Sequence, residues 1–191
     1  MIRGTSVALV VLGVASLMSQ SAQSAVTVLG NGLARSCFNS AEFGGNPNEG
    51  IATCSEALSE AALTVRDRAA TYVNRGILYS RIDQAQTALI DYDKGISMDP
   101  NLGEAYVDRG AALIALARYD EALQDIDKGI AAGANRLQIA YYDRGLAHEA
   151  LGNVRAAYED YKKAAEIEPG FELATSQLTR FKVVRRHSDG T

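Results

Sequence analysis

Apolar residues recur at the spacing of amphipathic helices along most of the chain. One continuous example has apolar side chains every few residues, at Ala112, Leu113, Leu116, Ala122, Leu123, Ile126 and Ile130. Proline lacks the N–H that a helix needs, and Pro100 and Pro169 end two of these stretches. The pattern predicts helices at about 69–82, 85–98, 103–116, 119–132, 138–151 and 154–167.

Short phrases repeat in step with this pattern. Tyr72-Val-Asn-Arg-Gly76 returns as Tyr106-Val-Asp-Arg-Gly110 and Tyr141-Tyr-Asp-Arg-Gly145, so that the glycines are 34 and then 35 residues apart. A second phrase begins at Asp91, Asp125 and Asp160. A fixed period of this length indicates one helical unit that is copied and stacked. Stacked units leave an extended concave surface, which favours a binding function over a catalytic one.

The repeated unit resembles that of a known family. With the glycine of each phrase at position 8, the units are residues 69–102, 103–136 and 138–171, and Leu137 is a single inserted residue. Small residues stand at positions 8, 20 and 27, large ones at 4 and 24, and proline at 32 in two units. This pattern closely resembles the tetratricopeptide repeat family, and the chain is expected to be an exported bacterial member. The resemblance implies an all-α fold, a solenoid of antiparallel helix pairs.

The resemblance also implies where a partner would bind. In this family, peptides lie in a concave groove lined by positions 2, 5, 9 and 12 of the first helices. In this chain these positions are Ala70, Val73, Ile77, Ser80, Glu104, Val107, Ala111, Ile114, Ile139, Tyr142, Leu146 and Glu149. The lining favours an apolar or partly basic extended segment. Asn74 at position 6 gives way to Asp108 and Asp143 in the next units, which argues against the carboxylate clamp of some relatives. The alternative is a groove filled by the N-terminal segment or the C-terminal helix of the same chain.

Position 7 departs from the family pattern, because an arginine stands where leucine is usual. Each arginine is matched by an aspartate 16 residues later, which gives Arg75 with Asp91, Arg109 with Asp125 and Arg144 with Asp160. Since a planar guanidinium suits a carboxylate, we expect three ion pairs that join the two helices of each unit. The alternative is a set of independent surface charges.

The residues before the first clear unit predict a degenerate repeat over 26–68. Aligning Gly50 with position 20 places Cys54 at position 24 and Cys37 at position 7. The segment 44–48, Gly-Gly-Asn-Pro-Asn, has turn chemistry. We therefore expect a disulfide between Cys37 and Cys54 that joins two helices. A metal site would need more ligands, and a catalytic thiol pair would more often be a close C-x-x-C.

The two ends of the chain have their own patterns. Residues 171–186 predict one more amphipathic helix, with Phe171, Ala174, Leu178 and Phe181 on one face, which would cap the array. A partner-binding helix is the alternative there. At the other end, Arg3, an apolar run and small residues up to Ala25 predict a signal peptide over residues 1–25, and hence a periplasmic or secreted protein without a membrane span after cleavage. An uncleaved membrane anchor is the alternative.

Charge and motifs narrow the function. A net charge of −4 disfavours nucleic acid binding, which needs a concentrated basic face. The chain has no nucleophile elbow, phosphate loop or calcium-loop pattern, so we expect neither an enzyme nor a bound cofactor or metal. The leading hypothesis is an exported scaffold or adaptor for a protein or peptide partner, with a role in envelope assembly or secretion. The alternative is a structural module that self-associates and fills the groove with its own chain.

Overall fold

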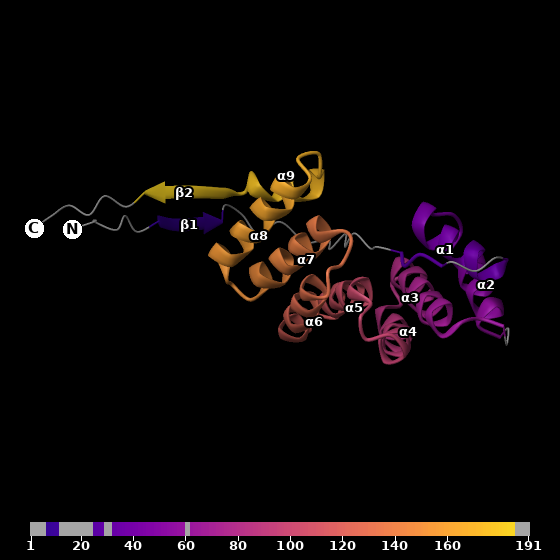
Figure 1. The fold of residues 1–191 in the computed structure, drawn as a ribbon. Helices are drawn as coiled ribbons and strands as arrows, with labels where there is room; N and C mark the ends of the chain where they lie inside the picture. The colour runs from indigo at the N-terminus through magenta and orange to yellow at the C-terminus, as the bar shows by residue number, and fades with distance from the viewer. Residues whose placement is uncertain (1–6, 12–24, 29–31, 60–61, 186–191) are drawn as a thin grey trace, which may run out of the picture.

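The computed structural model describes residues 7–11, 25–28, 32–59 and 62–185 of the 191-residue chain (Figure 1). The predicted signal peptide over residues 1–25 lies largely outside these residues. The elements in chain order are β1 (Val7–Val11), α1 (Leu33–Phe43), α2 (Pro47–Ser59), α3 (Val65–Arg81), α4 (Ala85–Met98), α5 (Gly103–Ala115), α6 (Tyr119–Ala131), α7 (Leu137–Ala150), α8 (Val154–Ile167), α9 (Glu172–Leu178) and β2 (Phe181–Arg185).

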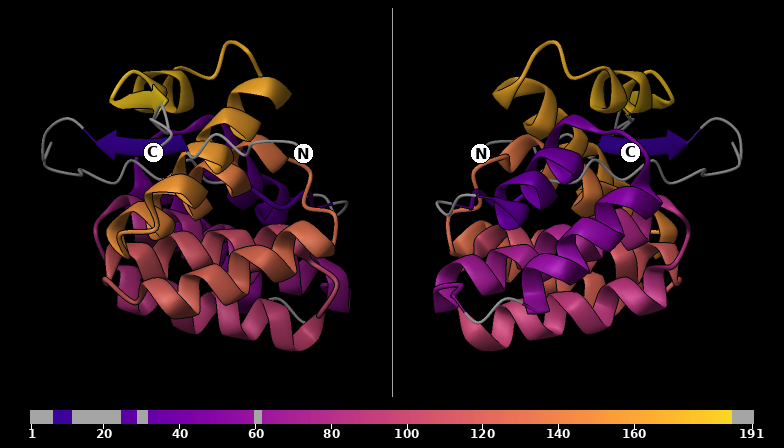
Figure 2. Two further views of the ribbon diagram at one scale, coloured as in Figure 1. Left: turned by 90° about the vertical axis from the view of Figure 1, so that its left-hand side faces the viewer. Right: turned by 90° about the vertical axis from the view of Figure 1, so that its right-hand side faces the viewer.

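The helices form antiparallel pairs that stack in chain order, which confirms the predicted helical solenoid. The pairs α3–α4, α5–α6 and α7–α8 are the three repeats, and α1–α2 forms a further pair before them. The array is curved. In the views of Figures 1 and 2, α1 at one end and α9 at the other rise on the same side of α4 and α6. That side is the concave side of the array.

Close approach within each pair depends on the glycine of the repeated phrase. A Cβ atom added to Gly76 would lie 2.7 Å from Cε1 of Tyr92, and one added to Gly145 would lie 2.7 Å from the same atom of Tyr161. Both tyrosines stand at position 24, and both are fully buried. A side chain at position 8 would therefore push the second helix away, because interiors leave no room for an extra atom.

Helix α3 begins four residues before the predicted boundary at residue 69. Thr64 caps this helix: its side-chain oxygen accepts a hydrogen bond from the backbone N–H of Asp67 at 3.0 Å, and its hydroxyl donates to the Asp67 carboxylate at 2.8 Å. The capping pattern lies outside the repeated unit, so the repeat numbering does not find it.

The predicted helix over 171–186 is wrong beyond residue 178. Helix α9 spans only Glu172–Leu178, and Phe181–Arg185 form strand β2. This strand pairs antiparallel with β1, with Val11 opposite Phe181 and Val7 opposite Arg185. The segment 181–185 contains two adjacent valines, which favour strands over helices. The described residues thus add a two-stranded sheet to the helices.

A cap at the end of the array is nevertheless present. Ala174 on α9 is fully buried, and Phe171, Leu178 and Phe181 pack on the core. The Phe181 ring lies 5.7 Å from the ring of Tyr158 and 5.9 Å from that of Tyr161, between ring centroids. The four apolar residues expected to share a face therefore do cover the last repeat.

The structure brings together each predicted arginine and aspartate. Arg109 donates two hydrogen bonds to Asp125, at 2.6 and 2.8 Å, and Arg75 and Arg144 do the same with Asp91 and Asp160. The aspartate side chains are almost completely buried, whereas each arginine side chain keeps about a fifth of its surface exposed. The bidentate geometry fixes both the spacing and the rotation of the paired helices.

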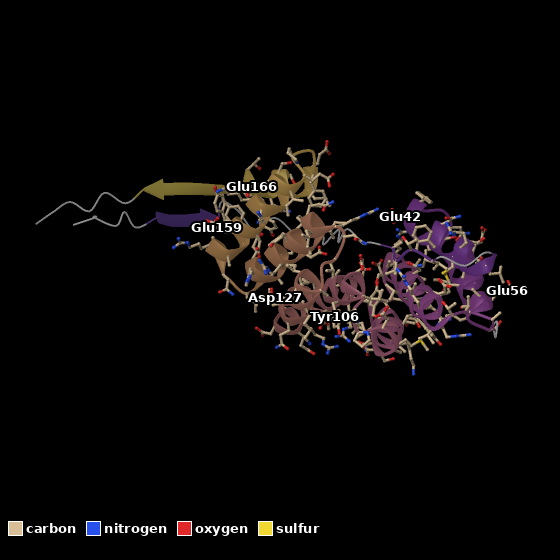
Figure 3. All side chains as sticks on the ribbon, in the orientation of Figure 1. Glu42, Glu56, Tyr106, Asp127, Glu159 and Glu166 are labelled. Carbon is tan, nitrogen blue, oxygen red and sulfur yellow. A yellow bond between two sulfur atoms is a disulfide. The ribbon has the colours of Figure 1, made fainter. Side chains whose placement is uncertain are left out.

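Each arginine also reaches the preceding unit, which the sequence did not predict. The third contact runs from Arg109 to Asp93 and from Arg144 to Asp127, each at 2.6 Å, and from Arg75 to the hydroxyl of Ser55 at 2.9 Å. The tyrosine at position 4 lies beside the guanidinium. In the second unit, the Cζ atom of Arg109 is 5.6 Å from the centroid of the Tyr106 ring. Tyr106 and Asp127 lie on the lower side in Figure 3, opposite Glu42. We call this row of contacts the arginine ladder.

The two cysteines face each other across the first helix pair. Cys37 on α1 and Cys54 on α2 are fully buried, and their sulfur atoms are 2.09 Å apart. The pair joins the two helices at the level where later units have the arginine and aspartate.

An Arg109→Ala, Asp125→Ala double-mutant cycle tests the ladder. We expect Arg109→Ala to cost about 3 kcal/mol of unfolding free energy, because it leaves buried Asp125 without its partner. The coupling energy between the two sites should be about 1–2 kcal/mol in urea denaturation. Exposed Glu159→Gln on α8 is the control. Additive effects of the two alanines would contradict the pairing.

Thiol titration tests the cysteine pair. The chain, unfolded without reductant, should show no free thiol, and reduction should release two. Closing a loop of this size stabilises by about 3 kcal/mol in the chain-entropy model, so reduction should also lower the urea midpoint. Two thiols in the unreduced sample would contradict an oxidised pair.

Candidate functional site

An extended stretch of the chain's own N-terminal segment lies on the concave side of the array. Residues 25–28 carry no helix or strand, and they run beside α3 in Figure 1. Asn74 on α3 holds this stretch through both polar atoms of its side-chain amide. The Asn74 Oδ1 accepts a hydrogen bond from the backbone N–H of Val26, and the Asn74 Nδ2 donates one to the Val26 carbonyl, each at 2.8 Å. Val28 and Asn74 are fully buried, and Val26 nearly so.

The chemistry of this contact is independent of side-chain identity. An asparagine amide offers one acceptor and one donor, and an extended residue offers one N–H and one C=O on the same edge. The two groups therefore match as neighbouring strands do. Asn74 stands at position 6 of its unit, so position 6 faces an extended chain on this side of the array.

Side chains from three regions surround the segment. Ala25 and Thr27 border a hollow together with Phe38, Glu42, Glu104, Asn135 and Arg136. Arg136, in the turn before α7, forms an ion pair with Glu42 near the end of α1. Glu104 on α5 accepts a hydrogen bond from the backbone N–H of Asn135 at 3.1 Å. The first helix pair and the second repeat are thus linked across the concave side.

The predicted groove lining is buried rather than open. Residues with at most 9% exposure are Val73, Ile77, Glu104, Val107, Ala111, Ile114, Ile139, Tyr142 and Leu146, and the Glu149 side chain is 9% exposed. The position-5 residues make contacts within their own units. Val73 and Val107 pack against Gly95 and Gly129 of their own units, and Tyr142 packs on Tyr161 and Phe171. They form the interface between the two helices of each unit.

The two acidic residues of the predicted lining already have partners. Glu104 binds Asn135, as described above. Glu149 accepts from Arg180 at 2.6 Å and from the Tyr161 hydroxyl at 2.9 Å, which ties α7 to the residues after α9. Part of the predicted groove is therefore covered by the C-terminal segment of the same chain.

Position 6 holds the residues that sequence reasoning undervalued. Asp108 and Asp143 occupy the place of Asn74 in the next two units, and both are fully buried. Neither carboxylate oxygen of Asp143 has a hydrogen-bond partner among the residues that the structure describes. Burial raises the pKa of Asp143 well above its usual range, and the nearby charge of Asp108 raises it further. The sequence indicates these residues by the change from asparagine to aspartate at position 6.

Within the part of the chain that the structure describes, His, Cys, Asp and Glu side chains do not gather in threes in a way that would hold a metal ion. None of its helices is both long and apolar enough to cross a membrane.

Comparison with known proteins identifies the repeats. Residues 69–102 and residues 139–171 each match a family model described as tetratricopeptide repeat. None of the curated proteins compared with the chain matches it.

Solved structures share the architecture. The first TPR domain of the human RPAP3 protein is 27% identical, with a TM-score of 0.57, over 60% of this chain and 89% of that one. The first TPR of Spaghetti (RPAP3), bound to the HSP90 peptide SRMEEVD, is 28% identical, with a TM-score of 0.55. The match covers 58% of this chain and 89% of that one. MamA is 23% identical, with a TM-score of 0.61, and the match covers 78% of this chain and 82% of that one. This likeness shows the fold alone.

Asp143→Asn tests the electrostatics of the concave side. Because the folded-state pKa of Asp143 lies above its unfolded value, the carboxyl costs stability as pH rises above about 4, and costs nothing below it. We expect the asparagine variant to match the parent near pH 4 and to exceed it at pH 7 by at least about 1.4 kcal/mol, the equivalent of one pKa unit. Urea denaturation at several pH values measures this, with Glu159→Gln as the control. A variant that is less stable than the parent at pH 7 would contradict the expectation.

Proposed function

Because this chain is a tetratricopeptide repeat protein, we propose that it is an interaction scaffold that binds an extended peptide or partner surface on its concave side. The observation that carries the proposal is the pair of hydrogen bonds between Asn74 and the backbone of Val26. The chain's own segment serves there as an example of the ligand: extended, with small and β-branched residues, and held by its backbone.

The chemistry of the partner is expected to differ from that of the peptide in the Spaghetti (RPAP3) structure. The peptide SRMEEVD carries three acidic side chains. The concave side of this chain is itself acidic at position 6, through Asp108 and Asp143, and like charges in a buried site repel strongly. A partner with neutral or basic residues is the better match.

A role outside the cytoplasm is part of this proposal. The basic start, the apolar stretch and the small residues up to Ala25 support export through a signal peptide, and the pairing of Cys37 with Cys54 suits an oxidising compartment. An adaptor in envelope assembly or secretion fits these features.

The second candidate is a self-contained structural module. The specific observation in its favour is that residues 25–28 already occupy part of the concave side. In this case the segment would be a permanent part of the fold, and association would involve other surfaces.

A displaced-segment variant separates the two candidates. Val26→Pro removes the N–H that donates to Asn74, so the chain's own segment should bind less well. A fluorescent, N-acetylated peptide of residues 19–28 should then bind the full-length variant at least about tenfold tighter than the parent chain, since the tethered segment no longer competes. Fluorescence anisotropy measures the affinity, and light scattering measures the oligomeric state.

Two matched variants complete the design. Thr27→Ala changes an exposed residue of the same segment and should leave peptide affinity at the parent level. Asn74→Ala, added to Val26→Pro, should abolish the gained binding. Absence of peptide binding by a Val26→Pro chain that keeps its helical circular dichroism would favour the structural module, as would a change in oligomer size.

A further inference from the structure

The concave side continues beyond Asn74 along α5 and α7. We propose that Asp108 on α5 and Asp143 on α7 form a cation-binding subsite for a positively charged group of the extended ligand, either a Lys or Arg side chain or a peptide N-terminal ammonium. This inference rests on the proposed function, because it names the chemistry of the ligand for that same site.

Repeat geometry places the two carboxylates in line with Asn74. All three residues stand at position 6 of consecutive units, on first helices that follow one another along the concave side. Asn74 touches an extended backbone from this position. Stacked units repeat the same orientation, so Asp108 and Asp143 continue the row along which an extended ligand would lie.

Asp143 is the residue that points to a ligand. It is fully buried, and neither of its oxygens has a hydrogen-bond partner among the described residues. A buried carboxylate without donors is unfavourable, whereas a cation that donates to it would relieve both the missing hydrogen bonds and the repulsion from Asp108. Asp108 contributes charge to the subsite, and the proposal makes no use of its other contacts.

The change from asparagine to aspartate also sets the kind of group that fits. Asn74 matches a backbone because it both donates and accepts. A carboxylate only accepts when it is ionised, so it cannot satisfy a backbone carbonyl. An ammonium or guanidinium carries donors alone and is the natural complement.

The residues around the bound segment cannot supply a side chain of that kind. Residues 4–34 contain no Lys, Arg or His. Within residues 4–34, the segment that binds Asn74 is therefore flanked only by neutral residues. An external peptide with a basic residue would gain a contact that the tethered segment lacks.

The direction of the bound segment predicts where the cation should stand. The chain on the N-terminal side of Val26 comes from β1, which contacts α8 at the far end of the array. A ligand extended in that direction passes α5 and then α7. Packed helices lie about 8–10 Å apart, so we take a similar step between successive units. An extended chain covers about 3.3 Å per residue, so one step between units corresponds to about three ligand residues. A cation that binds Asp108 should therefore stand about three residues before the ligand residue that binds Asn74. A cation that binds Asp143 should stand about six residues before it.

Peptide substitutions in the full-length Val26→Pro chain test the subsite. The parent peptide spans residues 19–28 and is neutral when acetylated and amidated. It has Gln23 and Gln20 three and six residues before Val26. We expect Gln23→Lys or Gln20→Lys in the peptide to tighten binding by about tenfold, as a charge-assisted hydrogen bond would. A peptide of residues 23–28 with a free N-terminus, compared with its acetylated form, measures the contribution of a terminal ammonium.

Protein variants assign the gain to the two aspartates. Asp108→Asn and Asp143→Asn, alone and together, should remove the advantage that the charged peptides have over the parent peptide. Glu159→Gln should change neither. The gain should also shrink between 50 and 500 mM NaCl, a readout that needs no variant of the aspartates.

The outcomes are distinct. A gain with lysine assigns a side-chain cation, and a gain with the free N-terminus alone assigns a terminal ammonium; either one supports the subsite. If the parent peptide binds and no charged form binds more tightly, the subsite is wrong and the proposed function stands. If no peptide binds a folded Val26→Pro chain, the proposed function fails as well.

Discussion

The arginine at position 7 is the contact on which the array depends. Each one joins three helices, because it binds an aspartate on the second helix of its own unit and a polar residue on the second helix of the unit before. A solenoid has few long-range contacts, so its stability is set by the interface within a unit and the interface between neighbours. One side chain per unit contributes to both interfaces. The position-4 tyrosine beside the guanidinium adds a cation–π contact and shields it from water.

This arrangement separates the two sides of the molecule by function. The ladder joins the helices on one side, and the glycines at position 8 bring the helices of a pair together inside. The residues at position 6, on the concave side, therefore do not join the helices of a pair, and polar residues can be buried there. Asn74 uses that freedom to hold an extended backbone, and Asp108 and Asp143 place negative charge further along the same row.

Periodicity was enough to predict the helix pairs and the partners of the arginines within each unit. Both follow from a spacing of 16 residues that is repeated in three copies, and local repetition is visible in a single sequence. Contacts between units were harder to predict, since Asp93 and Asp127 look like ordinary solvent-exposed charges until the units are stacked. The end of the chain was predicted incorrectly from residue 179 onward, because Phe181–Arg185 pair with a segment more than 150 residues away. The burial of the groove residues also depends on distant segments, which repeat numbering does not contain.

Occupation of the concave side by the chain's own segment does not exclude an external ligand. Residues 25–28 are tethered to α1 by a short connection, so their effective concentration near Asn74 is on the order of millimolar. The polar contacts of this segment with Asn74 are two hydrogen bonds between neutral groups, each of which contributes only about 1 kcal/mol net. A ligand that forms the same two bonds and also places a cation beside Asp108 or Asp143 makes an interaction that the tethered segment cannot make, because residues 4–34 contain no basic side chain. The segment would then act as a weak competitor that keeps Asn74 satisfied until a basic partner replaces it.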